Sequence, residues 1–184
     1  MYVITAVGAL AVAIVAERGY WLTLKWRHDV VAIAAALDKG DRDGAIRAAG
    51  DGPVGDVLRA GLGESEVDRA WEAMTAAAAF AEESIRARVP YLATVANLST
   101  MLGLLGTVYG LMLAFDSLGD TGAGERTIKL SEGIATAMST TALGLVVGLF
   151  AVACHAVLEA RVRQTVAAME AVASRVALAV GRAA

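Results

Sequence analysis

The sequence of 184 residues is poor in the side chains that build enzyme active sites. Because Cys154 is its only cysteine, the chain cannot form an internal disulfide. We interpret Cys154 as a small apolar side chain. Cys154 and His155 are neighbours, so on a helix they point about 100° apart and do not form a nucleophile–base pair. The sequence shows no nucleotide-binding loop and no metal-ligand cluster. We therefore predict that the chain is not an enzyme, with no metal site and no cofactor.

Positive charge is also scarce, and this excludes a class of partner. The formal net charge is −3 at pH 7, whereas binding to nucleic acid phosphates requires a basic face. Charge is missing altogether from two long stretches, residues 89–115 and 133–158, which contain no Asp, Glu, Lys or Arg. Nucleic acid is therefore excluded as a main partner, and the uncharged stretches indicate a different environment.

That environment is a lipid bilayer. The chain is 57% hydrophobic, its mean hydropathy is +0.58, and each uncharged stretch exceeds the roughly 20 residues that a helix needs to cross about 30 Å of hydrocarbon. A third apolar run opens the chain. A signal peptide is the alternative for this run, but no Lys or Arg precedes it and no A-x-A pattern precedes Glu17. We predict a retained transmembrane helix over residues 1–26.

The rest of the sequence predicts helices outside the bilayer. We expect helices over 29–37, 41–49, 53–62 and 65–88, the last continuing with little break into the next span. The fold class is therefore an all-α membrane protein with three transmembrane helices and long helical cytoplasmic extensions. The predicted segments are transmembrane helix 1 over 1–26, a cytoplasmic region over 27–88, transmembrane helix 2 over 89–115, a short periplasmic loop over 116–132, transmembrane helix 3 over 133–158 and a cytoplasmic C-terminal helix over 159–184.

The distribution of Lys and Arg sets the orientation. Residues 17–88 hold ten of these cations and the tail after Leu158 holds four, whereas the loop over 116–132 holds two. Because Lys and Arg concentrate on the cytoplasmic side, we expect a multi-pass protein of a bacterial inner membrane, with its N-terminus in the periplasm and its C-terminus in the cytoplasm.

Hydroxyls and glycines recur at helical spacing within the second and third spans. Glycines let helix backbones approach closely inside lipid, and we assign helix packing to Gly103, Gly106, Gly110, Gly144 and Gly148. The threonines have two possible roles. Each hydroxyl could bond its own preceding helical turn, or the hydroxyls could line an ion path; the candidates for that path are Thr100, Thr107, Thr136, Thr140 and Thr141.

Two runs in these spans make the sequence specific. The run 101–112, MLGLLGTVYGLM, and the run 133–145, GIATAMSTTALGL, resemble the second- and third-span signatures of the MotA/TolQ/ExbB proton-channel family, closest to its three-span TolQ/ExbB type. Their order and the short connection between them fit the same family.

The resemblance implies a function. Family members form homopentamers around a dimer of single-span partners of the ExbD, TolR or MotB type, whose helix supplies an essential Asp. Thr107 and Thr141 match the threonines that line the family's ion path. The chain would then be the channel and stator subunit of an inner-membrane motor complex that is driven by ion motive force and energises transport or envelope work.

Three departures from the family pattern stand in the spans. Many TolQ/ExbB members have Glu at the position of Thr136, and many have Pro at Thr100 and near Phe150. A hydroxyl-rich site suits either H⁺ or Na⁺ as the transported ion. The alternative to a channel subunit is a passive membrane scaffold or assembly subunit, in which the same stripes serve helix packing only.

Overall fold

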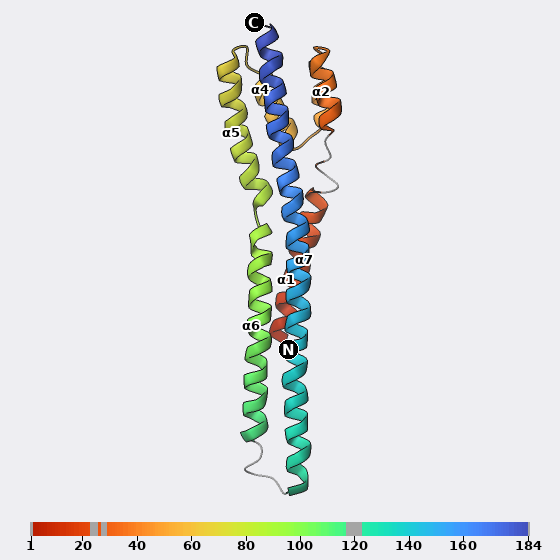
Figure 1. Ribbon diagram of the computed structural model, residues 1–184, viewed down its shortest axis with the longest axis vertical. Helices are drawn as coiled ribbons and strands as arrows, with labels where there is room; N and C mark the ends of the chain where they lie inside the picture. Colours follow the sequence, from red (N-terminus) through yellow and green to blue (C-terminus); the bar gives the residue numbers. More distant parts are fainter. Residues whose placement is uncertain (1, 23–25, 27–28, 117–122, 184) are drawn as a thin grey trace. The chain divides into compact units, whose positions relative to one another are not determined.

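The computed structural model describes residues 2–22, 26, 29–116 and 123–183, and this part of the chain is helical with no β-strand. Seven helices follow one another along it (Figure 1). They are α1 (Tyr2–Tyr20), α2 (Val30–Asp38), α3 (Arg42–Ala49), α4 (Pro53–Leu62), α5 (Val67–Arg86), α6 (Val89–Asp116) and α7 (Ala123–Ala183).

The chain divides into two compact units. The first, which we call the hairpin unit, comprises residues 1–15 and 88–156; the second, which we call the polar unit, comprises residues 16–87 and 157–184. The long helix α7 supplies its first part to the hairpin unit and its last part to the polar unit.

In the hairpin unit, α6 and the first part of α7 lie side by side and run in opposite directions (Figure 1). Helix α1 packs against α7, since a Cβ added at Gly8 would lie 3.3 Å from the Val147 side chain. Apolar stretches that are long enough to cross a membrane occur in Tyr2–Tyr20, in Val67–Asp116 and in Glu125–Arg182. Only 17% of the first stretch and 22% of each of the others is buried inside the chain. Their remaining surface therefore needs lipid or another protein around it.

The polar unit is a helical bundle with an apolar core. Asp29 caps α2, because its side chain accepts hydrogen bonds from the backbone N–H groups of Val31 and Ala32. Asp41 caps α3 in the same way, and Pro53 stands in the first turn of α4. The largest buried side chains of this unit interlock between α2, α4, α5 and α7: Ile33, Val54, Val57, Leu58, Met74, Ile85, Val162, Met169, Val172 and Val176.

The short helices that the sequence predicts are confirmed as α2, α3 and α4. The helix expected over 65–88 is confirmed as α5, but its expected continuation into α6 is interrupted. Ala87 leaves the helical conformation at ψ 133° and Arg88 has a φ of +68°, a left-handed value that is uncommon outside glycine. Pro90, whose ring disfavours a continuous helix through the preceding turn, explains the position of the break.

Two expected boundaries also differ. The part of the expected loop from Ala123 onward is helical, and its i, i+4 ion pair of 3.9 Å between Glu125 and Lys129 suits an exposed helix. Helix α1 ends at Tyr20, and beyond it the Trp26 N–H donates to the Trp21 carbonyl at 3.1 Å. The remainder of the extension expected to Trp26 lies outside the described residues.

The core of the polar unit gives a stability prediction. Met74 is 1% exposed, so Met74→Ala leaves a cavity and should lower the free energy of unfolding by about 2–5 kcal/mol. Phe80→Ala, on the same helix, is the control, because Phe80 is 79% exposed. Thermal unfolding of the detergent-solubilised protein should show a clearly lower midpoint for Met74→Ala only. Equal shifts for the two variants would contradict this core.

Candidate functional site

The contact between α6 and α7 depends on backbones that approach without side chains between them. A Cβ added at Gly144 would lie 2.6 Å from the Ser99 carbonyl oxygen and 2.8 Å from the Gly103 Cα. A Cβ at Gly148 would lie 3.2 Å from the Ala96 carbonyl oxygen. The contact at Gly144 leaves no room for a side chain, and the contact at Gly148 is tight. Small residues allow such close approaches of helix backbones inside lipid.

The other two glycines assigned to packing also lie on this contact. A Cβ at Gly110 would lie 2.9 Å from the Ala137 Cβ, and one at Gly106 would collide with the Thr140 side chain. The pairs fix the register of the hairpin, since Gly103 lies beside Gly144 and Gly110 lies beside Ala137. Residues near 106 on α6 are therefore level with residues near 140 on α7.

Within this register, the Thr141 hydroxyl joins the two helices. Thr141 Oγ1 donates to the Gly103 carbonyl oxygen at 2.8 Å, across 38 residues of sequence. A threonine in a helix ordinarily donates to a carbonyl of its own preceding turn. The close approach at Gly103 and Gly144 brings a carbonyl of the other helix within reach, so the hydroxyl is held at the contact between α6 and α7.

Three of the other candidate threonines bond to their own helix. Thr100 donates to the Ala96 carbonyl at 3.0 Å, Thr107 to the Leu104 carbonyl at 2.6 Å, and Thr140 to the Thr136 carbonyl at 2.8 Å. The structure therefore brings Thr107, Thr140 and Thr141 to one level of the hairpin. Thr100 lies two helical turns nearer the start of α6, where it would contact a Cβ at Gly148.

Thr136 has a different setting. It is exposed on α7, and within the described part of the chain its hydroxyl makes no hydrogen bond. Glu132 lies four residues earlier and is exposed on the same face of α7. The sequence analysis assigns Glu132 to a loop and so misses that it stands one helical turn from Thr136; its spacing of four residues is the signal that identifies it.

Ionisable side chains are otherwise rare along the hairpin. His155 lies at its end, and its Nδ1 is 3.2 Å from the Val89 carbonyl oxygen, a bond in which Nδ1–H donates in the matching tautomer. This contact ties α7 to the start of α6, which is a packing role. The described residues contain no group of three or more His, Cys, Asp or Glu placed to hold a metal ion.

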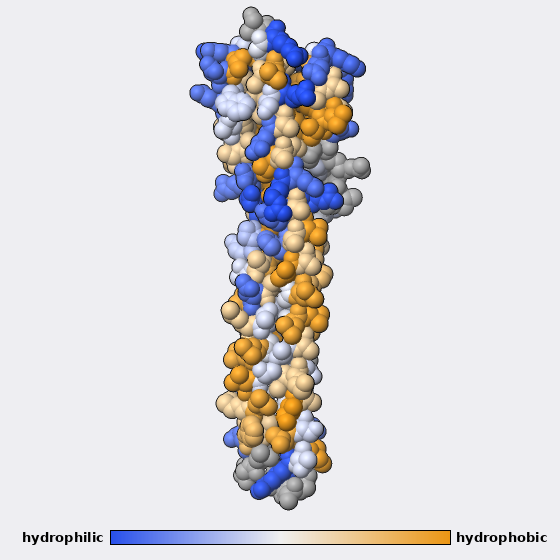
Figure 2. Space-filling view, viewed as in Figure 1, coloured by the Kyte–Doolittle hydropathy of each residue, from blue (hydrophilic) through white to orange (hydrophobic). Residues whose placement is uncertain are grey.

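The surface of the hairpin unit is mainly apolar and is interrupted by paler patches, whereas hydrophilic residues gather on the polar unit (Figure 2). The exposed apolar side chains of α6 include Met101, Leu104, Leu105, Val108 and Phe115. In water, a protein with such a surface would aggregate. Large contiguous apolar patches mark membrane or protein contacts.

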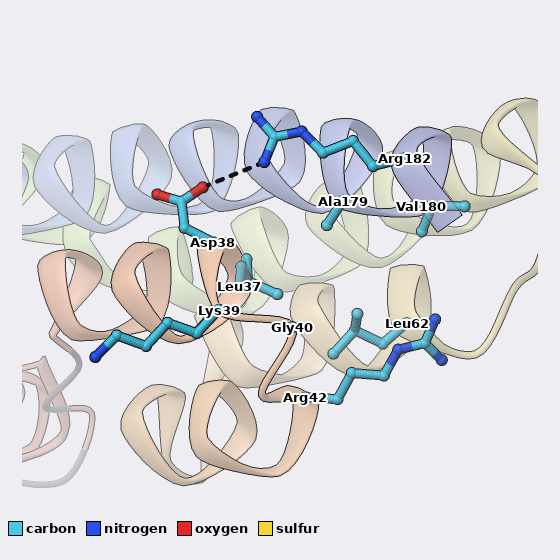
Figure 3. Close-up of a pocket in the computed structure, with 9 residues that line it drawn as sticks. All are labelled: Leu37, Asp38, Lys39, Gly40, Arg42, Leu62, Ala179, Val180 and Arg182. Carbon is cyan, nitrogen blue, oxygen red and sulfur yellow. Dashed lines mark ion pairs between the residues drawn. The ribbon is translucent and has the colours of Figure 1, made fainter. Parts of the chain in front are cut away.

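The polar unit holds a separate pocket of about 370 Å³ between the α2–α3 turn, the end of α4 and the end of α7 (Figure 3). Asp38 pairs there with Arg182 at 3.7 Å and with Arg175 at 3.6 Å. Lys39 points away from this ion pair (Figure 3). Exposed ion pairs of this kind contribute only about 0–1 kcal/mol to stability. None of the threonines that the sequence singles out lines this pocket.

The architecture defines an all-helical membrane protein with three apolar stretches of spanning length and a glycine-packed, hydroxyl-bearing hairpin. The profile of the MotA/TolQ/ExbB proton channel family matches residues 49–171. Because this match covers well over half of the chain, the chain belongs to that family.

Individual relatives support the assignment. The chain is 46% identical over 81 residues to the Tol-Pal system protein TolQ of Haemophilus influenzae, a match that covers 44% of this chain and 35% of the relative. It is 35% identical over 91 residues to the biopolymer transport protein ExbB of Aquifex aeolicus, covering 50% and 61% of the two chains. ExbB of Salmonella typhimurium is 34% identical over 88 residues, covering 48% and 36%. The chain thus matches between about a third and three fifths of these relatives' lengths.

The glycine contact gives the second prediction. Gly144→Ala places a Cβ against backbone atoms of α6 that no side-chain rotation relieves, so the hairpin must separate and the Thr141–Gly103 bond must break. We expect a markedly lower yield of folded protein in size-exclusion chromatography. Gly19→Ala is the matched control, since nothing lies within 4 Å of a Cβ there. A Gly144→Ala protein that elutes and melts like Gly19→Ala would contradict the close approach.

Proposed function

We propose that the chain is the channel and stator subunit of an inner-membrane motor complex driven by ion motive force. The observation that supports this most strongly is a glycine-packed hairpin, in a member of a proton channel family, that offers hydroxyls but no carboxylate or amine along its apolar length. A proton path needs a group that can take up and release a proton within the membrane, and intramembrane ionisable residues mark such paths. A threonine hydroxyl can orient water or bond a carboxylate, but it does not titrate near neutral pH.

The missing ionisable group therefore comes from a partner in this proposal. A dimer of single-span proteins of the ExbD, TolR or MotB type would bring an Asp to the level of Thr107 and Thr141. Removal from water raises the pKa of such a carboxyl, and hydroxyl contacts moderate that rise. The carboxyl could then alternate between its protonated and charged forms as ions pass, with H⁺ or Na⁺ as the ion.

The exposed surface of the spans supports a ring of copies. About a fifth of each apolar stretch is buried within one chain, and three helices are too few to enclose a pore. We propose a homopentamer with the partner dimer at its centre. Thr136, which is exposed and whose hydroxyl makes no hydrogen bond in the described chain, stands where many TolQ/ExbB members have Glu, and Glu132 lies one turn before it. Glu132 would attract cations to the outer mouth of the path.

The placement in the membrane follows the positive charges. The segments predicted to be cytoplasmic, residues 27–88 and 159–184, would lie in the cytoplasm, and the connection between α6 and α7 would face the periplasm. The three spans would cover 1–26, 89–115 and 133–158. Lipid would then surround the outer faces of the ring.

A passive scaffold is the second candidate, and one observation favours it. The hydroxyls of Thr100, Thr107 and Thr140 are each bonded to their own helix, as they would be in helices that only pack. The two candidates differ in what happens when a hydroxyl is removed, because a scaffold needs the shape of the side chain and a channel also needs its oxygen.

The third prediction separates these candidates. Thr107→Ala or Thr141→Ala, in the chain co-purified with a single-span partner of the ExbD or TolR type, should lower potential-driven proton or sodium uptake into proteoliposomes by about tenfold or more, since a hydrogen bond to a charged group contributes about 1.5–3 kcal/mol. Thr141→Ser is the matched control, because it keeps the oxygen and should keep most of the uptake.

The mass of the detergent-solubilised complex is measured in parallel for each variant. The channel proposal expects a ring of the same mass in all of them. Normal uptake in both alanine variants would contradict it, and so would a subunit that remains a monomer with its partner present.

A further inference from the structure

We propose that the face of α6 that bears Thr94, Asn97 and Thr100 lines a water-filled cytoplasmic half of the ion path, with Asn97 as its central polar group. This inference rests on the proposed function, which supplies the ring and the orientation. It adds to that function a set of residues on the cytoplasmic side of the path.

The exposed amide of Asn97 requires an explanation. It is exposed on α6, and within the described residues its amide has no hydrogen-bond partner. It lies eight residues into a helix that begins at Val89, which is about 12 Å along the helix axis. An amide at that depth that faced lipid would lose several kcal/mol in unmade hydrogen bonds.

Other polar side chains follow Asn97 along α6. Thr94 lies three residues nearer the start of the helix and is exposed, and its hydroxyl also makes no hydrogen bond in the described chain. Thr100 lies three residues further and is exposed, with its hydroxyl on the Ala96 carbonyl. Residues three apart are neighbours on a helix surface. Seven residues beyond Thr100, on the same face, is Thr107. The four side chains form one polar track about 20 Å long.

At Asn97 the track is directed away from α7 of its own chain, whereas Thr100 lies at the edge of the hairpin contact, next to Gly148. Ser99, two residues from Asn97 and so about 200° around the helix, is fully buried beside Gly144. The Asn97 side is therefore directed out of the hairpin, toward lipid, a neighbouring copy or water.

Helices α1 and α7 of a neighbouring copy offer the amide no partner. The contact between Gly148 and Ala96 sets the level of Asn97 on α7, and residues 146–152 there contain no polar side chain. Residues 6–11 of α1, on either side of the Gly8 contact with Val147, contain none either. Lipid offers nothing to an amide. With lipid and the neighbouring α1 and α7 helices excluded, we assign water as the partner of the amide, and a hydrated track leading from Thr107 toward the start of α6 gives an ion its exit.

Cysteine accessibility tests this directly. In a Cys154→Ala background, Asn97→Cys and Thr94→Cys are each compared with Leu98→Cys, which replaces a 46% exposed apolar residue at the same depth but about 100° away around the helix. The probe is a water-soluble cationic methanethiosulfonate added to the assembled complex. Thiols react as thiolates, which form in water and not in lipid.

The expected result is modification of Asn97→Cys and Thr94→Cys at least about tenfold faster than Leu98→Cys, because only the first two would be hydrated. Equal or slower modification of both, in a complex whose mass shows an intact ring, overturns this inference and leaves the proposed function standing. A chain that proves monomeric overturns the proposed function and this inference with it. If Asn97→Cys does not assemble, the comparison of Thr94→Cys with Leu98→Cys decides.

Discussion

The account depends on the contact at which the backbones of α6 and α7 touch. Gly103 and Gly144 remove the side chains that would separate the helices, and this proximity lets the Thr141 hydroxyl reach the Gly103 carbonyl at 2.8 Å. The register set there places Thr107, Thr140 and Thr141 at one level. Without the glycines, the same hydroxyls would bond to their own helical turns. Nothing would then hold them at one level of the hairpin or on facing sides of the two helices.

The absence of charge along the hairpin has a consequence for assembly. Burying an unpaired carboxylate in lipid is costly, so a subunit that must first fold alone gains by having no such group. The hairpin instead presents oxygens that are already positioned by the backbone. In the proposed function, the carboxylate enters the membrane on a partner and meets these oxygens only in the complex. Each chain also leaves most of its apolar surface exposed. This surface is large enough to contact lipid, neighbouring copies and partner helices.

Much of the fold could be predicted from the sequence because its signals are local. The uncharged stretches predict the helical hairpin, and Asp29, Asp41 and Pro53 mark the starts of α2, α3 and α4. The break at Arg88 could not be predicted in the same way, because a positive φ is usually signalled by glycine and here belongs to an arginine. The start of α7 at Ala123 could not be predicted either, because the polar residues there suit an exposed helix as well as a loop.

The candidate site was predictable in its residue types and not in its bonds. Spacing identifies Thr107 and Thr141, but it does not say whether a hydroxyl bonds its own turn, as Thr107 does, or the other helix, as Thr141 does. That choice depends on the distance between helices, which the sequence sets only indirectly through its glycines. Likewise, the direction in which Asn97 faces becomes evident only once Ser99 is seen against α7.

The central claim is that this chain supplies the walls of an ion path and another polypeptide supplies its titratable group. Ion flux through proteoliposomes that contain the purified chain alone, under an imposed membrane potential, tests it most directly. The account predicts flux no higher than that of protein-free liposomes, with a rise when the single-span partner is included. Flux through the chain alone at the rate of the complete complex would contradict it.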